Sequence, residues 1–298
     1  MSGSSATEPL PGGAPAQAQA RAGTASRVPG ALVVGGALVA VYIVAAVVGV
    51  FWTPHDPLAS LGIPFQGPSS QYLLGTDVLG RDVLSRVLSG AHEVLILALV
   101  STTISTVIGA ATGLTSGYVG GKLDAVLMRS LEVLISIPFL MLALLVIAAA
   151  GAAHGTQELL IGIIVLIYAP RTARVARSVA QELVVRDFVV VARARGESAW
   201  SIVRREMLPN ATGPLLVEFG VRAGYAPILI GSLAFLGFGV HPPTPDWGLM
   251  INENRAAIAS DPSSVLAPAG ALAGLVVGLN LLTDGVARVL GRSVERSL

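Results

Sequence analysis

Three ionisable residues, Glu132, Glu218 and Arg222, lie within or beside apolar stretches of the chain. A charge inside a bilayer is costly, so such residues usually form pairs or line a pathway for a solute. Glu218 and Arg222 are four residues apart, which places them on one face of a helix where they can form an ion pair. Both stand near one end of their apolar stretch, where long side chains can reach water. A structural pair and a pathway lining both remain open.

The sequence contains no motif that is typical of an enzyme's active site. The nearest approach to a phosphate-binding loop, Gly120-Gly121-Lys122-Leu123, lacks the upstream glycine spacing and the hydroxyl residue that this loop requires. There is no His-Glu-x-x-His pattern, no nucleophile elbow and no cysteine. The four histidines have no metal-ligand spacing and are interpreted as surface or interface residues: His55, His92, His154 and His241. We expect no catalytic residue, metal or cofactor in this chain, so energy for any work must come from another polypeptide.

The composition indicates an integral membrane protein. Of the 298 residues, 53% are hydrophobic and only 12% are charged, whereas a soluble domain has about 25% charged residues. A membrane helix needs about 20 mainly apolar residues. Six segments approach this, and they predict an all-α transmembrane domain over residues 30–298: Ala31–Trp52, Val94–Ser116, Asp124–Ala150, Glu158–Ala169, Leu215–Val240 and Val265–Leu282.

Residues 1–29 are rich in Ser, Gly, Ala, Pro and Gln, which is typical of a disordered tail. The apolar run that follows is longer than that of a cleavable signal peptide and leads into Thr53-Pro54, so we interpret it as a retained first span.

The distribution of arginine predicts the orientation. Because cytoplasmic segments carry an excess of Lys and Arg, residues 171–214 are expected in the cytoplasm: they hold Arg171, Arg174, Arg177, Arg186, Arg193, Arg195, Arg204 and Arg205. The opposite side has Arg81, Arg86 and Arg255. Both termini are therefore expected in the cytoplasm, and residues 53–92 outside.

The pattern of the cytoplasmic segment predicts two amphipathic helices. Val179–Arg195 is expected to extend the fourth span, Gly196 to let the chain turn, and Ser198 to cap a second helix. Leu208-Pro209 is expected to end that helix, since proline disfavours helical geometry in the residue before it. Trp200, Val203 and Met207 form one apolar stripe on it. Such a helix either lies on lipid or fits a partner's groove, and physical arguments leave both open.

Several stretches carry a resemblance to a known family. Ala192 and Gly196, followed after nine residues by Glu206-Met207-Leu208-Pro209, resemble the EAA loop of ABC importer permeases. Other stretches look like the C-type transmembrane subunit of the dipeptide, oligopeptide and nickel branch: residues 75–86, 136–138, 235–240, 242–248 and 279–285. The resemblance covers the chain from about Ala31 onward.

The resemblance implies a type I ABC importer permease fold with six transmembrane helices, in the bacterial inner membrane. It implies a second, B-type permease, one or two ATPase subunits that bind ATP and Mg²⁺, and an extracytoplasmic substrate-binding protein as partners, with membrane lipid around the spans and no nucleic acid. The solute would be a dipeptide, an oligopeptide or a related ligand such as haem or a nickel complex. The residues expected to couple to the ATPase are Ala192, Gly196, Trp200, Val203, Met207, Leu208 and Pro209.

The chain departs from the family pattern at two places. The glutamate and first alanine of the family's triplet fall on Val190 and Val191, so the salt bridges of that glutamate are missing here. We therefore expect packing and the remaining arginines to hold the loop. Glu132 stands where relatives usually carry aspartate, which is a conservative change.

A glycine- and aspartate-rich motif precedes the second span, outside the membrane. It consists of Gly75, Thr76, Asp77, Gly80, Arg81 and Asp82. One interpretation is a tight glycine turn in which Asp77 and Asp82 cap a short helix. The other is a contact for a binding protein, and the two are compatible.

Two other classes of protein were weighed. An ion-gradient-driven secondary transporter would use Glu132, Glu218 or Arg222 as a relay and would show internal repeats, but no repeat is visible. An intramembrane enzyme would need a buried Ser–His or Asp pair, and the sequence places none inside a span.

Overall fold

The structure is a computed structural model that describes residues 30–151, 156–240 and 243–297. The predicted tail at residues 1–29 therefore lies outside the described residues. Those ranges hold helices and one isolated β-bridge, Thr76 to Asp82, with no strand. The long elements are α1 (Gly30–Phe51), α2 (Val83–Val119), α5 (Gln157–Leu183), α8 (Leu208–Phe235) and α10 (Ser263–Ser297). The short ones are α3 (Gly121–Ser136), α4 (Phe139–Ala149), α6 (Asp187–Ala194), α7 (Ala199–Ile202), the π turn η1 (Val203–Met207), α9 (Trp247–Asn254) and the 3₁₀ turn η2 (Arg255–Ala257).

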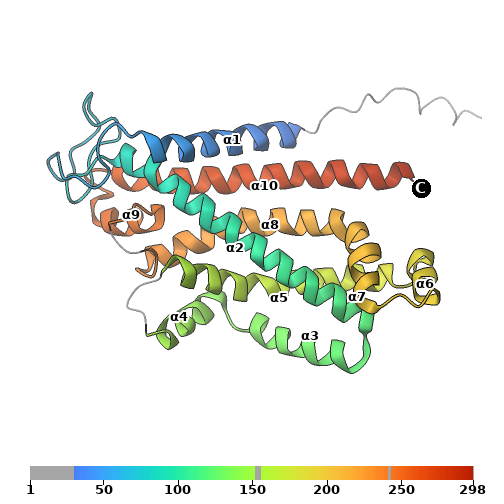
Figure 1. The fold of residues 1–298 in the computed structure, drawn as a ribbon. Coiled ribbons are helices and arrows are strands. Elements are labelled where there is room, and N and C mark those ends of the chain that lie inside the picture. The colour runs from blue at the N-terminus through green and yellow to red at the C-terminus, as the bar shows by residue number, and fades with distance from the viewer. Residues whose placement is uncertain (1–29, 152–155, 241–242, 298) are drawn as a thin grey trace, which may run out of the picture.

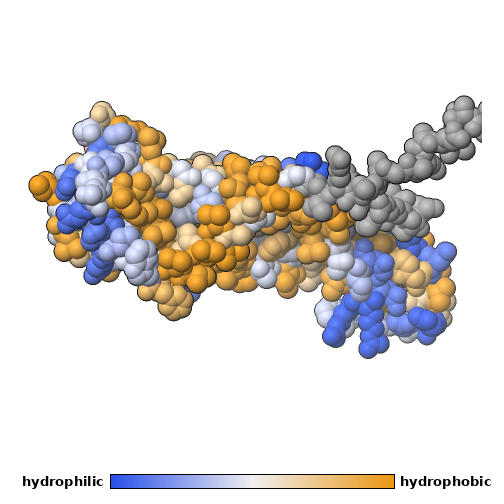
Figure 2. All heavy atoms as spheres, turned by 90° about the horizontal axis from the view of Figure 1, so that it is seen from above, coloured by the Kyte–Doolittle hydropathy of each residue, from blue (hydrophilic) through white to orange (hydrophobic). Residues whose placement is uncertain are grey.

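The long helices form an elongated bundle. α1 and α10 lie side by side along one edge, and α2 crosses the bundle to pack on α5 and α8 (Figure 1). Residues 52–82 and α9 gather at one end, and α6 and α7 gather at the other. Figure 2 shows an orange apolar belt between these two hydrophilic ends. This distribution is the one that a protein crossing a bilayer requires.

Five helices are long and apolar enough to cross a membrane, and α3 with α4 make a sixth candidate span that is bent by 95°. The predicted six-span, all-helical fold is thus confirmed, with its third span broken at Ile137-Pro138. Ile137 has extended geometry (φ −79°, ψ 128°), because the proline ring disfavours the helical region for the residue before it.

The second span begins earlier than predicted, at Val83 instead of Val94. Asp82 caps it by accepting a hydrogen bond from the backbone N–H of Ser85, so a full extra helical segment forms before the apolar run. With 37 residues and ~1.5 Å per residue, α2 is about 55 Å long, well beyond the ~30 Å hydrocarbon thickness. Its first turns therefore belong to the hydrophilic end.

Two predictions about residues 179–209 were wrong. The fourth span does not continue to Arg195, because α5 ends at Leu183 and α6 begins separately after Arg186, whose backbone is extended. Leu208-Pro209 does not end a helix either, since helical structure runs from Ala199 to Phe235. The π turn explains this: the Leu208 N–H bonds to the carbonyl of Val203, five residues back. Pro209 has no N–H to donate, and it follows directly after this wider turn, so the helix continues where an ordinary helical hydrogen bond cannot form.

Small residues set the spacing of α2 and α5. A Cβ added at Gly113 would lie 2.2 Å from the carbonyl oxygen of Ala173, and one added at Gly117 would lie 2.6 Å from the Cβ of Ala180. Such a stripe of small residues lets membrane helices approach closely and gain van der Waals contact. The two helices thereby make the most extensive helix–helix contact among the described residues.

Candidate functional site

The hydrophilic end at α6 and α7 is built around one glycine turn. Gly196 has φ +77°, a conformation that side chains with a Cβ rarely adopt, and it turns the chain between α6 and α7. The Ser198 side chain then caps α7 by accepting from the Ser201 N–H at 3.3 Å. The predicted turn and cap both form, and they place a short helix across the end of the bundle.

Three of the predicted coupling residues are buried inside this chain. Ala192, Val203 and Met207 are 0%, 5% and 0% exposed, and with Ile202 they join one apolar cluster with α2, α5 and the start of α8. Their burial fixes α6, α7 and η1 to the transmembrane helices. The predicted stripe of Trp200, Val203 and Met207 is therefore divided between the chain's own core and its surface.

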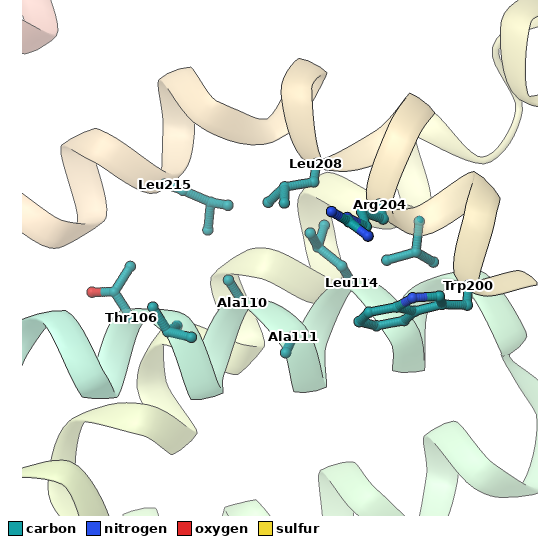
Figure 3. Close-up of a pocket in the computed structure, with 10 residues that line it drawn as sticks. Thr106, Ala110, Ala111, Leu114, Trp200, Arg204, Leu208 and Leu215 are labelled. Atoms are coloured by element: carbon teal, nitrogen blue, oxygen red, sulfur yellow. The ribbon is translucent and has the colours of Figure 1, made fainter.

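The other side of the segment faces outward. Trp200 is 65% exposed and Leu208 is 39% exposed, and Gly196, Arg204 and Pro209 are also exposed. Figure 3 shows the Trp200 indole and the Arg204 guanidinium beside an apolar groove between α2 and the start of α8. The groove has a volume of about 380 Å³, and it is lined further by Thr106, Val107, Ala110, Ala111, Leu114, Val203, Leu208 and Leu215.

Val190 and Val191, which replace the family's glutamate and alanine, are 53% and 51% exposed on α6. The loop is held instead by packing and by the Arg193 guanidinium, which lies 5.0 Å from the centre of the Tyr118 ring. This agrees with the expectation drawn from the missing glutamate.

An ion pair that the sequence did not suggest joins α3 to α5. Arg177 donates from Nε and Nη2 to the two carboxylate oxygens of Asp124 at 2.6 and 2.5 Å. The Ser116 hydroxyl donates to the same carboxylate at 2.5 Å. α2, α3 and α5 therefore meet at one charged junction near the segment.

At the opposite end, the 75–82 motif forms a buried turn. Asp77 is fully buried; its Oδ1 accepts from the N–H groups of Leu79 and Arg81, at 2.8 and 3.0 Å. Its Oδ2 accepts from Arg81 Nε at 2.7 Å and also from Arg86. Gly75 and Gly80 have φ of +75° and +72°, so the glycines supply the turn geometry.

The turn is locked to α9 by residues distant in sequence. Glu253 accepts from Arg81 at 2.8 Å and from Arg86 at 2.9 Å, and Asn254 accepts from the Val78 N–H at 2.9 Å. Thr76 and Asp82 are 0% and 2% exposed. The side chains of this motif are thus turned inward. The sequence did not single out Glu253 or Asn254, because each needs a contact that only the fold creates.

The predicted pair of Glu218 and Arg222 forms along α8. Arg222 donates from Nε and Nη2 to Glu218 Oε1 at 2.7 and 2.6 Å. Glu218 stands ten residues after the start of α8 and is only 8% exposed. Glu132 is exposed on α3 and has no ion pair among the described residues.

Of the four histidines, two can be placed. His55 Nδ1 lies 3.3 Å from Asp82 Oδ2, and His92 Nδ1 lies 2.7 Å from the Ser89 carbonyl oxygen. Over the described residues no group of three or more His, Asp or Glu side chains could hold a metal ion. His154 and His241 lie outside the described residues.

Comparison with known proteins gives consistent results. Residues 105–296 match the family described as "Binding-protein-dependent transport system inner membrane component". The glutathione transport system permease protein GsiD of Escherichia coli is 38% identical over 229 residues, which is 77% of this chain and 75% of that protein. The protein of the same name from Pectobacterium atrosepticum is 33% identical over 221 residues, covering 74% and 72%.

A solved structure, an inward-facing conformation of the MetNI methionine ABC transporter, has a similar fold. The TM-score is 0.57 at 20% identity, and the alignment covers 69% of this chain and 96% of that chain. These matches exclude the secondary transporter and the intramembrane enzyme. The chain belongs to the binding-protein-dependent transport system inner membrane components: it is a multi-pass inner-membrane permease subunit of an ATP-driven ABC importer, which works with a partner permease and ATPase subunits and is not itself an enzyme.

Proposed function

We propose that this permease forms half of the pathway for a peptide-like solute: a dipeptide, an oligopeptide, glutathione or a related ligand such as haem or a nickel complex. Its partners would be a B-type permease, one or two ATPase subunits and an extracytoplasmic substrate-binding protein. The two relatives named as glutathione permeases support the solute class. The end that carries 53–92 would face outward, and the end formed by α6, α7 and η1 would lie in the cytoplasm.

We propose further that the ATPase docks on the exposed side of residues 196–209, at Trp200, Arg204 and Leu208. The observation that carries this is the division of the segment into an exposed aromatic surface and a buried side. Ala192, Val203 and Met207 would act as anchors that pass movement on to α2, α5 and α8. When ATP draws the ATPase subunits together, the segment and the spans would move as one body and change the facing of the pathway.

Replacing Trp200 by aspartate tests this proposal. A buried tryptophan at an interface typically contributes more than ~2 kcal/mol to binding, or about thirtyfold in the dissociation constant. We expect Trp200→Asp to stay in the membrane and to recover less than a tenth of the ATPase that the wild type recovers in a pull-down. Trp52→Asp is the matched control, because Trp52 is 62% exposed at the opposite end. Wild-type recovery of the ATPase by Trp200→Asp would place the docking surface elsewhere.

We propose that the 75–82 motif has a structural role. It positions α9 and the loops around it for a binding protein, and it does not itself contact that protein. Its buried ion pairs support this assignment.

A further inference from the structure

A second cavity lies among the spans, away from the groove of Figure 3. It has a volume of about 210 Å³ and opens between α5, α8 and the point where α3 breaks before α4. Its walls carry two arginines and two tyrosines among apolar residues: Phe139, Ile167, Tyr168, Arg171, Arg222, Tyr225, Ile228 and Leu229.

The cavity is open on one side, where Tyr225 and Ile228 are 52% and 42% exposed, and its two arginines stand near the middle of their helices. Arg222 stands 14 residues after the start of α8 and 13 before its end, and Arg171 stands 14 and 12 residues from the ends of α5. At ~1.5 Å per residue, Arg171 and Arg222 are each about 20 Å from either end of their helices. Charged groups near the middle of membrane helices are costly and commonly mark the path of a solute.

The positive charge of the cavity is only partly balanced. Arg222 is paired with Glu218, at 2.6 Å. Arg171 donates to the backbone carbonyl of Ile167 at 2.5 Å, and the structure gives it no carboxylate partner within the described part of the chain. Two guanidinium groups thus share the cavity with one carboxylate, which leaves a net charge of about +1.

A comparison within α5 shows what a structural arginine looks like here. Six residues beyond Arg171, Arg177 meets both oxygens of the Asp124 carboxylate. Arg171, nearer the middle of α5, has no such partner within the described residues, although an unbalanced charge is costly in a membrane helix. An anion that enters the cavity from outside the chain would therefore form the ion pair that Arg171 lacks.

The surroundings of Arg171 suit an anion. The break in the third span brings the N-terminus of α4 to the cavity at Phe139, and Pro138 before it supplies no side-chain cap. The first N–H groups of a helix carry partial positive charge. Discontinuous helices beside a charged cavity are how many transporters bind anionic groups of their solutes.

We propose that this cavity binds a carboxylate of the solute on its way through the importer. Arg171 forms the bidentate ion pair, and Arg222, held by Glu218 and lying 5.7 Å from the centre of the Tyr168 ring, adds charge from the facing helix. The proposal rests on the proposed function for the statement that the solute is a peptide; the recognised chemistry is a carboxylate.

Binding to the purified importer without its binding protein tests the cavity. The probes are trialanine and trialanine amide, which differ in the C-terminal carboxylate. We expect the wild type to bind trialanine about tenfold more tightly than the amide, the size of one charge-assisted hydrogen bond. Arg171→Gln should abolish that difference and Arg171→Lys should keep part of it. Arg174→Gln, an exposed position on the same helix and outside the cavity, should leave it unchanged.

Uptake of the same probes by proteoliposomes, with the binding protein present, separates the two proposals. If the wild type takes up peptides but Arg171→Gln keeps the carboxylate preference in binding, the cavity proposal fails and the proposed function stands. If the wild type takes up no peptide but prefers trialanine to its amide through Arg171, the cavity proposal stands and the peptide assignment fails. Equal binding of both probes by the wild type overturns the cavity proposal outright.

Discussion

At the scale of single residues, the charged groups of this permease fall into those that the fold neutralises and those that it leaves available. Asp77, Glu253 and Asp124 each hold arginines within hydrogen-bond distance. Arg171 inside the bundle and Arg204 at its end have no carboxylate partner among the residues that the structure describes. These two arginines belong to the two surfaces proposed here for solute and ATPase.

One carboxyl group outside the spans should make stability depend on pH. Asp246 is 1% exposed; its Oδ1 caps α9 by accepting from the Leu249 N–H at 3.0 Å, whereas its Oδ2 is buried and has no hydrogen-bond partner. Burial, with a smaller contribution from the Glu93 carboxylate, raises the pKa of Asp246 to about 6. The folded state therefore holds this proton more tightly than the unfolded chain, in which the pKa is 3.8.

The stabilisation is fully present below pH ~4 and is lost as the pH rises to about 6. Two pKa units correspond to about 3 kcal/mol. Asp246→Asn keeps a side chain that can cap the helix and cannot ionise. We expect the variant to gain stability relative to the wild type between pH 4 and 6, measured by thermal unfolding in detergent. A constant difference between the two proteins across this range would contradict the assignment.

The sequence could predict those parts of the site whose contacts join residues close together in the chain, and it could not predict the parts that depend on distant residues. The Gly196 turn and the Ser198 cap form within a few residues, so local pattern was sufficient. The burial of the 75–82 motif depends on Glu253, more than 170 residues away, and no local signal carries it. Arg171 was passed over because it was counted among the arginines of a cytoplasmic segment, whereas α5 continues through it.

At the scale of elements, hydropathy was sufficient for the spans and failed for the helical segments that leave the apolar belt. The first turns of α2 carry Ser85 and Arg86, and α6 has only eight residues, so both depend on caps and tertiary packing. The continuous path through Leu208-Pro209 depends on a π turn, which has no reliable sequence signal.

The contact of α2 with α5 should be intolerant of even one added methyl group. Gly113→Ala would bring a Cβ within 2.2 Å of the Ala173 carbonyl oxygen, so the helices must separate. We expect a loss of about 1–3 kcal/mol in stability, read as a lower unfolding temperature. Gly162→Ala on α5 is the control, because a Cβ there meets nothing within 4 Å, and it should be neutral or slightly stabilising. Equal effects of the two changes would show that this close approach is not needed.

At the scale of the whole molecule, the chain joins two hydrophilic ends through an apolar belt (Figure 2). The buried side of residues 192–207 ties one end to α2, α5 and α8, and α2 runs on to the other end, where Asp82 begins it. A movement applied at the end where we propose that the ATPase docks can therefore reach the opposite end through a single long helix. α3 and α4 pack less extensively and lie at the margin of the bundle (Figure 1).

The central claim is that this permease moves a peptide-like solute only when an ATPase acts on residues 196–209. The direct measurement is uptake of a labelled tripeptide by proteoliposomes that contain both permeases, the ATPase subunits and the binding protein. The account predicts uptake that requires ATP and is lost in Trp200→Asp while Trp52→Asp retains it. Uptake by this chain alone without ATP, or undiminished ATP-dependent uptake by Trp200→Asp, would contradict it.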